Sequence, residues 1–159
     1  MTAAAPADHG LDVLPVRAEE VWDDVTLRFT RTPLRPGQAV LPEDAVWVER
    51  FRRIGAAKAR QWNMPGLIGD LQVLVSELVT NALQHGTGSQ VAIRYVVADG
   101  RVLVAVDDGS PGAAQVRQAG EEDETGRGMF LVDALATTWG VSEDGTTTWF
   151  SLTDEGGSR

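Results

Sequence analysis

The stretch LQVLVSELVTNALQHG, residues 71–86, decides the fold and organises the rest of the chain. Its apolar residues recur at intervals of three and four and predict the buried stripe of an α-helix. The residues of this stripe are Leu71, Leu74, Val75, Leu78 and Ala82. Glu77, Asn81 and His85 fall on a neighbouring stripe, because residues four apart lie about one turn apart on the same side of a helix.

Glu77 and Asn81 have the side chains that a metal-assisted reaction requires. A carboxamide supplies an oxygen ligand to a hard cation, and a carboxylate orients or deprotonates a nucleophile. We therefore predict that Asn81 holds Mg²⁺ and that Glu77 is a general base. Taken alone, a Glu-x-x-x-Asn pair is more often part of the solvated face of an amphipathic helix, and this alternative stays open.

A strand-like alternation of Val102, Val104 and Val106 leads to two aspartates and a Gly-Ser-Pro-Gly turn. Asp108 follows Val106 by two residues, so its side chain is expected on the same face of the strand, whereas Asp107 points the other way. A carboxylate that accepts a hydrogen bond from an exocyclic amine can distinguish adenine from bases that lack this donor. Asp108 is therefore our predicted ligand contact, and an ordinary Asx-type turn is the alternative.

The segment Gly126-Arg127-Gly128-Met129 precedes a second helical pattern. Its expected buried positions are Phe130, Leu131, Ala134, Leu135 and Thr138. Glycines at the start of a helix let backbone amides approach a phosphate, and the helix dipole favours an anion there. Arg127 would add a charge-assisted contact, and a surface arginine on a loop is the alternative.

Together these segments resemble a known superfamily. Residues 77–86 (ELVTNALQHG), Asp108-x-Ser-Pro-Gly and Thr125-Gly126-Arg127-Gly128 resemble, in order and spacing, the N, G1 and G2 boxes of the GHKL ATPases. This superfamily includes gyrase, histidine kinases and MutL. Within it, the chain is most similar to the small stand-alone bacterial anti-sigma factors with serine kinase activity, the RsbW-like type. The resemblance covers roughly residues 22–152.

The resemblance implies a Bergerat ATP-binding fold with ATP or ADP and Mg²⁺ as ligands. It implies Glu77 as general base, Asn81 on Mg²⁺, Asp108 on the adenine amine and residues 126–128 on phosphate. The other motif residues predicted to contact the nucleotide are His85, Ser110, Gly112, Thr125 and Met129.

Three features depart from the superfamily pattern. Glu124 stands where many members begin the G2 box with glycine, so one flexible point is missing. Residues 121–124 are all acidic and would repel a triphosphate unless they face solvent or a basic partner. Residues 145–149 (GTTTW) stand where relatives commonly have Gly-Lys-Thr, so no lysine is expected in the site.

Length and composition agree with this interpretation without selecting it. With 159 residues, the chain is most simply one domain. We predict a largely flexible N-terminal tail over residues 1–21, an ATP-binding domain over residues 22–152 and a flexible tail over residues 153–159. A net charge of -9 argues against direct nucleic-acid binding, which needs clustered basic side chains. The chain has no cysteine, secretory segment or apolar run approaching 18 residues, so we predict a cytoplasmic protein without membrane contact.

The remaining periodicities predict an α+β fold, a two-layer sandwich in which a mixed, mainly antiparallel sheet has helices on one face. The expected strands lie near residues 25–29, 91–97, 102–106 and 146–152, with a hairpin turn at Asp99-Gly100. A further helix is expected from Glu43 or Asp44 to Trp62. Lys58 falls on the apolar face of that helix, where we expect its stem to extend to water.

The leading hypothesis for function follows from the resemblance. It is an ATP-dependent regulator of transcription that sequesters a sigma factor and phosphorylates a serine or threonine of an antagonist protein. Relatives also suggest a homodimer. Two alternatives stay open: a binding module that uses nucleotide without transferring phosphate, and a small ATPase that activates water. Arginines at positions 50, 52, 53 and 60 suggest a basic surface for an acidic partner, with a solvated helix face as the alternative.

Overall fold

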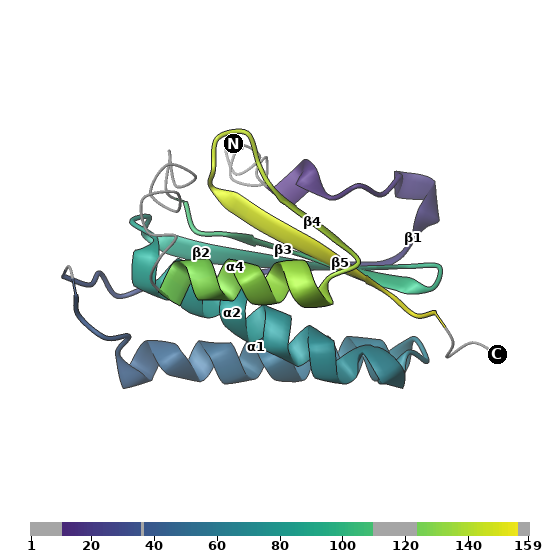
Figure 1. The fold of residues 1–159 in the computed structure, drawn as a ribbon, viewed down its shortest axis with the longest axis horizontal. Helices are drawn as coiled ribbons and strands as arrows, with labels where there is room; N and C mark the ends of the chain where they lie inside the picture. Colours follow the sequence, from purple (N-terminus) through teal and green to yellow (C-terminus); the bar gives the residue numbers. More distant parts are fainter. Residues whose placement is uncertain (1–10, 36, 110–123, 156–159) are drawn as a thin grey trace, which may run out of the picture.

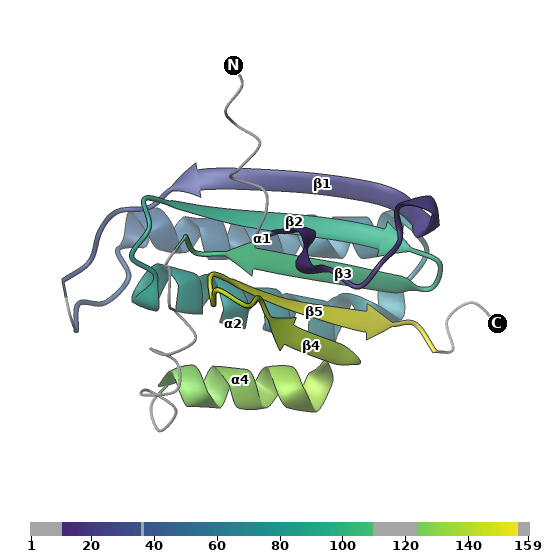
Figure 2. The same ribbon diagram turned by 90° about the horizontal axis from the view of Figure 1, so that it is seen from above.

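A five-stranded antiparallel sheet forms one layer of the molecule (Figures 1 and 2). The computed structural model describes residues 11–35, 37–109 and 124–155. The strands are β1 (Val21–Thr30), β2 (Gln90–Ala98), β3 (Arg101–Asp107), β4 (Thr138–Val141) and β5 (Thr147–Thr153). Their order across the sheet is β1-β2-β3-β5-β4, and every neighbouring pair is antiparallel. The predicted hairpin joins β2 to β3, where Gly100 takes the positive φ of 71° that the turn requires.

Helices cover one face of this sheet, as the sequence predicted. They are α1 (Pro42–Gln61), α2 (Ile68–His85) and α4 (Glu124–Leu135), and two short 3-10 helices are η2 (Ala18–Glu20) and η3 (Pro65–Leu67). Helix α2 lies between α1 and α4 (Figure 2). The motif helix is therefore the central helix of its layer, and the predicted α+β two-layer fold is confirmed.

The main core lies between the sheet and the helices because alternate residues of each strand point towards α1 and α2. The residues of β2 and β3 that do so are Val91, Ile93, Tyr95, Val97, Val102, Val104 and Val106. Tyr95 is fully buried, and its hydroxyl donates a 2.7 Å hydrogen bond to the carbonyl of Phe51 in α1. Burial raises the pKa of Tyr95. This bond therefore joins a neutral phenol to α1 and fixes that helix on the sheet.

The opposite face of the sheet carries a smaller second core. Leu11 and Leu14 are buried there against alternate residues of β2 and β3, namely Ala92, Val96, Leu103 and Ala105. Arg94 of β2 ties this segment down by donating a 2.8 Å hydrogen bond to the carbonyl of Leu11. The structure describes residues 11–21 of the predicted N-terminal tail: residues 11–20 pack on the sheet, and Val21 begins β1 (Figure 1).

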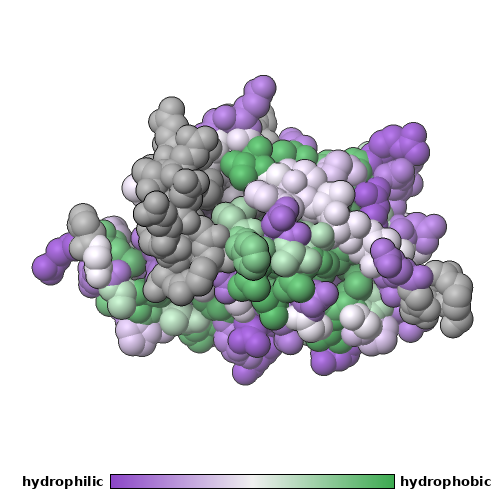
Figure 3. All heavy atoms as spheres, viewed as in Figure 1, coloured by the Kyte–Doolittle hydropathy of each residue, from purple (hydrophilic) through white to green (hydrophobic). Residues whose placement is uncertain are grey.

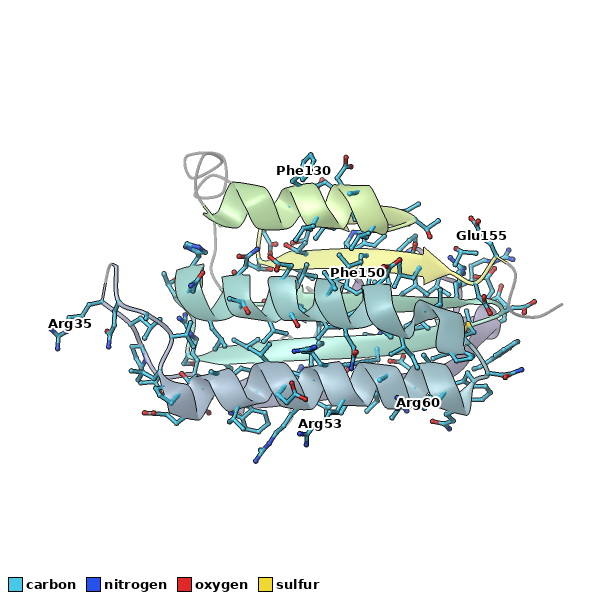
Figure 4. All side chains as sticks on the ribbon, turned by 60° about the horizontal axis from the view of Figure 1, so that its bottom comes forward. Arg35, Arg53, Arg60, Phe130, Phe150 and Glu155 are labelled. Atoms are coloured by element: carbon cyan, nitrogen blue, oxygen red, sulfur yellow. The ribbon has the colours of Figure 1, made fainter. Side chains whose placement is uncertain are left out.

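Three of the buried positions predicted for this helical segment are wrong. Phe130 is 72% exposed and points away from the sheet (Figure 4), while Val132 in the same helix is fully buried. Ala134 is also exposed, and the exposed Thr138 lies in β4. Hydrophobic residues gather over α4 on the face seen in Figure 3. The error arose because residues 129–136 are almost all apolar, so more than one helix face satisfies the periodicity.

Lys58 of α1 does not extend into water. Its Nζ lies 2.6 Å from Oδ2 of Asp23 in β1, and both side chains are less than one-fifth exposed. The Trp62 indole donates a 2.9 Å hydrogen bond to the same oxygen. Burial alone would raise the pKa of Asp23, but the hydrogen bonds from Lys58 and Trp62 outweigh it and lower this pKa.

One described helical segment, Pro65–His85, is long and apolar enough to cross a membrane by length and composition alone. The same helix is the centre of the helical layer, and Leu71, Leu74 and Val75 are fully buried in the main core. Its apolar character is therefore explained by its place in the core.

Candidate functional site

A small pocket, partly open to solvent, lies where α2, α4, β3 and β5 meet. Its lining residues are Leu78, Asn81, Ala82, Val106, Asp108, Met129 and Thr148. Four of the seven lining residues are apolar, and the other three carry a carboxamide, a carboxylate and a hydroxyl. This combination suits a flat aromatic base that carries a few polar groups. Three of the predicted contacts, Asn81, Asp108 and Met129, therefore come together from three separate elements.

Helix α2 supplies the predicted catalytic pair. Asn81 is half-buried and lines the pocket, and Glu77 lies one turn earlier on the same helix, also half-buried. Their stripe borders the buried stripe, so both side chains are held at the edge of the core instead of in open solvent. His85 is the last residue of α2 and is exposed. The structure thus places His85 away from the lining of the pocket.

Asp108 follows the end of β3 and is 4% exposed. Its backbone N–H donates a 3.0 Å hydrogen bond to the carbonyl of Thr146, which ties the end of β3 to the start of β5. Asp107 instead accepts a 2.8 Å hydrogen bond from the N–H of Gly109. Burial raises the pKa of Asp107, and the hydrogen bond from Gly109 opposes this. The two aspartates thus have the two roles that strand alternation predicts, one in the pocket and one in the turn.

The glycines after α2 allow the chain to pass close to Asp108. A Cβ atom added at Gly86 would lie 2.9 Å from Cβ of Asp108, and one added at Gly88 would lie 2.8 Å from the Asp108 carbonyl oxygen. Side-chain carbons do not approach other atoms so closely, so glycine is required for this packing. The His-Gly-x-Gly sequence therefore fixes the C-terminal end of α2 against the carboxylate.

Thr148 is a pocket residue that the sequence analysis missed. It lies opposite Val106 in the β3–β5 ladder and is 5% exposed. Its Oγ1 is buried and finds no hydrogen-bond partner in the described part of the chain. The available signal was its alternation with Phe150 and Leu152, which put a hydroxyl at a position facing the core. A buried hydroxyl without a partner is costly, which is typical of an atom that a ligand satisfies.

The third motif lies at the start of α4. Because α4 begins at Glu124, residues Thr125, Gly126 and Arg127 lie in its first turn, and Gly128 follows directly within the helix. The first four N–H groups of a helix have no partner within the helix, so this turn presents donors to an anion. Two further predicted contacts, Ser110 and Gly112, lie outside the described residues.

These residues fit an adenine nucleotide with Mg²⁺. The unpartnered Thr148 hydroxyl and the Asp108 carboxylate supply polar contacts for a base, and the apolar walls would cover its faces. Asn81 offers the oxygen ligand that Mg²⁺ prefers, in a setting where phosphates supply most of the other ligands.

Comparison with known proteins places this region in an ATPase family. Residues 41–152 match the histidine kinase-like ATPase domain. The chain is also 36% identical over 75 residues to the uncharacterized protein SCO4941 of Streptomyces coelicolor, a match that spans 45% of this chain and 71% of that protein. The region that matches the family, residues 41–152, includes α1, α2, the strands after β1 and all three motifs. The chain therefore belongs to the histidine kinase-like ATPase domain family.

Proposed function

We propose that this chain is an ATP-binding anti-sigma factor with serine/threonine kinase activity towards an antagonist protein. The observation that carries the nucleotide part is the pocket in which Asn81, Asp108 and Thr148 meet. Membership of the ATPase family supports the same part. The regulatory part rests on the resemblance of the three motifs to RsbW-like proteins.

Adenine recognition follows from the composition of the pocket. Asp108 accepts a hydrogen bond from the exocyclic amine, and the Thr148 hydroxyl donates to or accepts from the same edge of the base. Leu78, Ala82 and Val106 form apolar walls for the ring. A base without the amine would leave a buried carboxylate without this donor, which is the strongest source of discrimination between similar ligands.

Phosphate transfer would take place at the α2 side of the site. Asn81 is the residue that would hold Mg²⁺, which when bound neutralises phosphate charge. Glu77, one turn away, would accept the proton of an incoming serine or threonine hydroxyl, and the first turn of α4 would direct N–H groups at the phosphates. The nucleophile is therefore expected to approach over the edge of α2.

The test is phosphotransfer by Glu77→Ala, with labelled ATP, Mg²⁺ and a panel of purified candidate antagonist proteins. ADP affinity should stay within about threefold of wild type, whereas transfer should fall by about 10²- to 10⁴-fold, the usual contribution of a general base. Asp70→Ala is the matched control, since Asp70 is an exposed acid in the first turn of the same helix. Equal transfer by wild type and Glu77→Ala would remove Glu77 from this role.

The same assay separates the two alternative functions. Phosphate release without any protein acceptor would identify a small ATPase. Nucleotide binding with neither release nor transfer, and with partner affinity that depends on the nucleotide, would identify a binding module. A cytoplasmic location and a homodimer belong to the proposal, and size-exclusion chromatography with light scattering tests the homodimer.

The sigma factor or antagonist would need a surface outside the pocket. Arg53 points away from the molecule (Figure 4), but both Arg52 and Arg53 pair with Glu49, at 3.4 and 3.1 Å. The Arg50 guanidinium lies over the Trp47 ring. We infer that the basic surface of α1 is weaker than the sequence suggests. Unchanged partner affinity after charge reversal at Arg52 and Arg53 would exclude it.

A further inference from the structure

Arg31 is a buried charged residue outside the three motifs. It follows β1 directly and is 5% exposed. Its Nη2 donates a 2.6 Å hydrogen bond to the carbonyl of Leu83, and its Nη1 donates to the carbonyl of Gly86 and lies 3.4 Å from that of Gly88. These carbonyls belong to the C-terminal end of α2 and the residues just after it. Arg31 therefore caps the end of α2 that carries the negative pole of the helix dipole.

The guanidinium also lies beside Asp108. A Cβ atom added at Gly86 would lie 3.2 Å from Nη1 of Arg31 and 2.9 Å from Cβ of Asp108, so both side chains border the same small space. Burial lowers the pKa of Arg31, and the charges of Asp108 and Asp44 act in the opposite direction. Arg31 does not line the pocket, so its effect on a bound base would be indirect, through Asp108 and the end of α2.

The other side of Arg31 is fixed as well. Asp44, at the start of α1, is 4% exposed and accepts a 2.9 Å hydrogen bond from the N–H of Thr32. The Thr32 hydroxyl lies 3.4 Å from the second oxygen of the same carboxylate. The backbone next to Arg31 is thus held by α1. The guanidinium consequently has little freedom to move away from the end of α2.

We propose that Arg31 is a positioning residue for recognition of the 6-amino group of a purine nucleotide. It holds the end of α2 against the end of β3 and keeps Asp108 in place as an anionic acceptor at the pocket. The inference rests on the proposed nucleotide binding and adds a residue that no motif contains. It predicts that Arg31 controls the preference for ADP over inosine diphosphate (IDP), which has an oxygen in place of the amine.

The experiment is calorimetric titration of wild type, Arg31→Met and Arg31→Lys with ADP and with IDP. Arg31→Met should weaken ADP binding by at least about tenfold, the lower end of the effect of residues that orient a binding group. IDP binding should change by less than about threefold, because IDP lacks the 6-amino group that would donate to Asp108. Arg31→Lys retains the charge and should restore most of the ADP preference, even though one ammonium cannot reach all three carbonyls.

Arg94→Met is the matched control. Arg94 is also a largely buried arginine, with its side chain 18% exposed. It donates hydrogen bonds to Asp24 and to the carbonyl of Leu11 on the face of the sheet opposite the helices. Its loss should lower thermal stability and leave the ADP-to-IDP ratio unchanged. If Arg31→Met does not fold, Arg31→Gln takes its place in the same titrations: a lowered ADP-to-IDP ratio supports the proposal, and a wild-type ratio overturns it.

The outcomes separate this inference from the proposed function. If wild type does not bind ADP, or Asp108→Ala binds it as well as wild type does, the proposed function fails and the inference fails with it. If binding needs Asp108 but Arg31→Met weakens ADP and IDP by the same factor, or weakens neither, Arg31 is only a structural residue and the inference alone is overturned.

Discussion

The hydroxyl of Thr148 should lower the stability of the protein while it contributes to ligand binding. Its Oγ1 is buried without a partner in the described structure, a state that costs about 1–3 kcal/mol. Valine has almost the same shape and replaces this hydroxyl with a methyl group. Thr148→Val is therefore expected to raise the free energy of unfolding by about 1 kcal/mol, or Tm by about 2–4 °C for a chain of this size.

The same substitution should weaken nucleotide binding. It removes one neutral hydrogen bond to the base, which contributes about 0.5–1.5 kcal/mol. The dissociation constant for ADP should therefore rise about 2- to 12-fold. Urea denaturation without nucleotide measures the first effect, and calorimetric titration with ADP measures the second. A gain in stability together with a loss of affinity is what a residue retained for binding produces.

Ser151→Ala provides the opposite pattern as a control. Ser151 is also a buried hydroxyl residue of β5, but its Oγ forms a 2.6 Å hydrogen bond with the Thr138 hydroxyl. Its loss should lower the free energy of unfolding by about 1 kcal/mol and leave ADP affinity unchanged. If Thr148→Val proved less stable than wild type and bound ADP equally well, the role assigned to this hydroxyl would be refuted.

Three further substitutions test the packing of the fold. Lys58→Met should destabilise the protein most near pH 7. The folded-state pKa of Asp23 is lowered, so the stabilisation from the Lys58–Asp23 pair is lost as the pH falls below about 4. In urea denaturation, the difference in unfolding free energy between Lys58→Met and wild type should therefore shrink by about pH 3. Gly86→Ala places a Cβ atom as close as 2.5 Å to other atoms. It should lower the free energy of unfolding by about 1–3 kcal/mol and weaken ADP binding. Gly66→Ala is the control: its Cβ meets nothing within 4 Å, so the free energy of unfolding should change by less than about 0.5 kcal/mol. Leu11→Ala should lower stability by about 2–5 kcal/mol and leave ADP affinity unchanged, because Leu11 is buried on the far face of the sheet; a shift in affinity would show that the two faces are coupled.

The sequence predicted those parts of the fold in which the residue pattern is compatible with a single structure. The stripe that begins at Leu71 fits only one helix face, and Asp99-Gly100 between two alternating runs fits only a hairpin. Both predictions are confirmed, and so is the position of Asp108 on the core side of its strand. In α4 the pattern was degenerate, and the choice of Phe130 over Val132 was wrong.

Contacts between distant segments lay beyond the sequence patterns. Arg31 contacts carbonyls more than 50 residues away, and nothing in its own neighbourhood marks it as a helix cap. Lys58 was expected to extend into water, because only the fold places Asp23 beside it. Thr148 is a candidate ligand contact only because the fold places it in the same pocket as Val106 and Asp108. Local periodicity determines which face a residue occupies, and tertiary packing determines what it meets there.

The most direct test of nucleotide binding is calorimetric titration of wild type, Asn81→Ala and Asp108→Ala with ATP and ADP, with and without Mg²⁺. We predict that wild type binds both nucleotides, that Asp108→Ala abolishes binding, and that Mg²⁺ strengthens binding only when Asn81 is present. Two results would contradict the assignment of this pocket as an adenine nucleotide site. One is that wild type binds neither nucleotide, and the other is that Asp108→Ala binds as tightly as wild type.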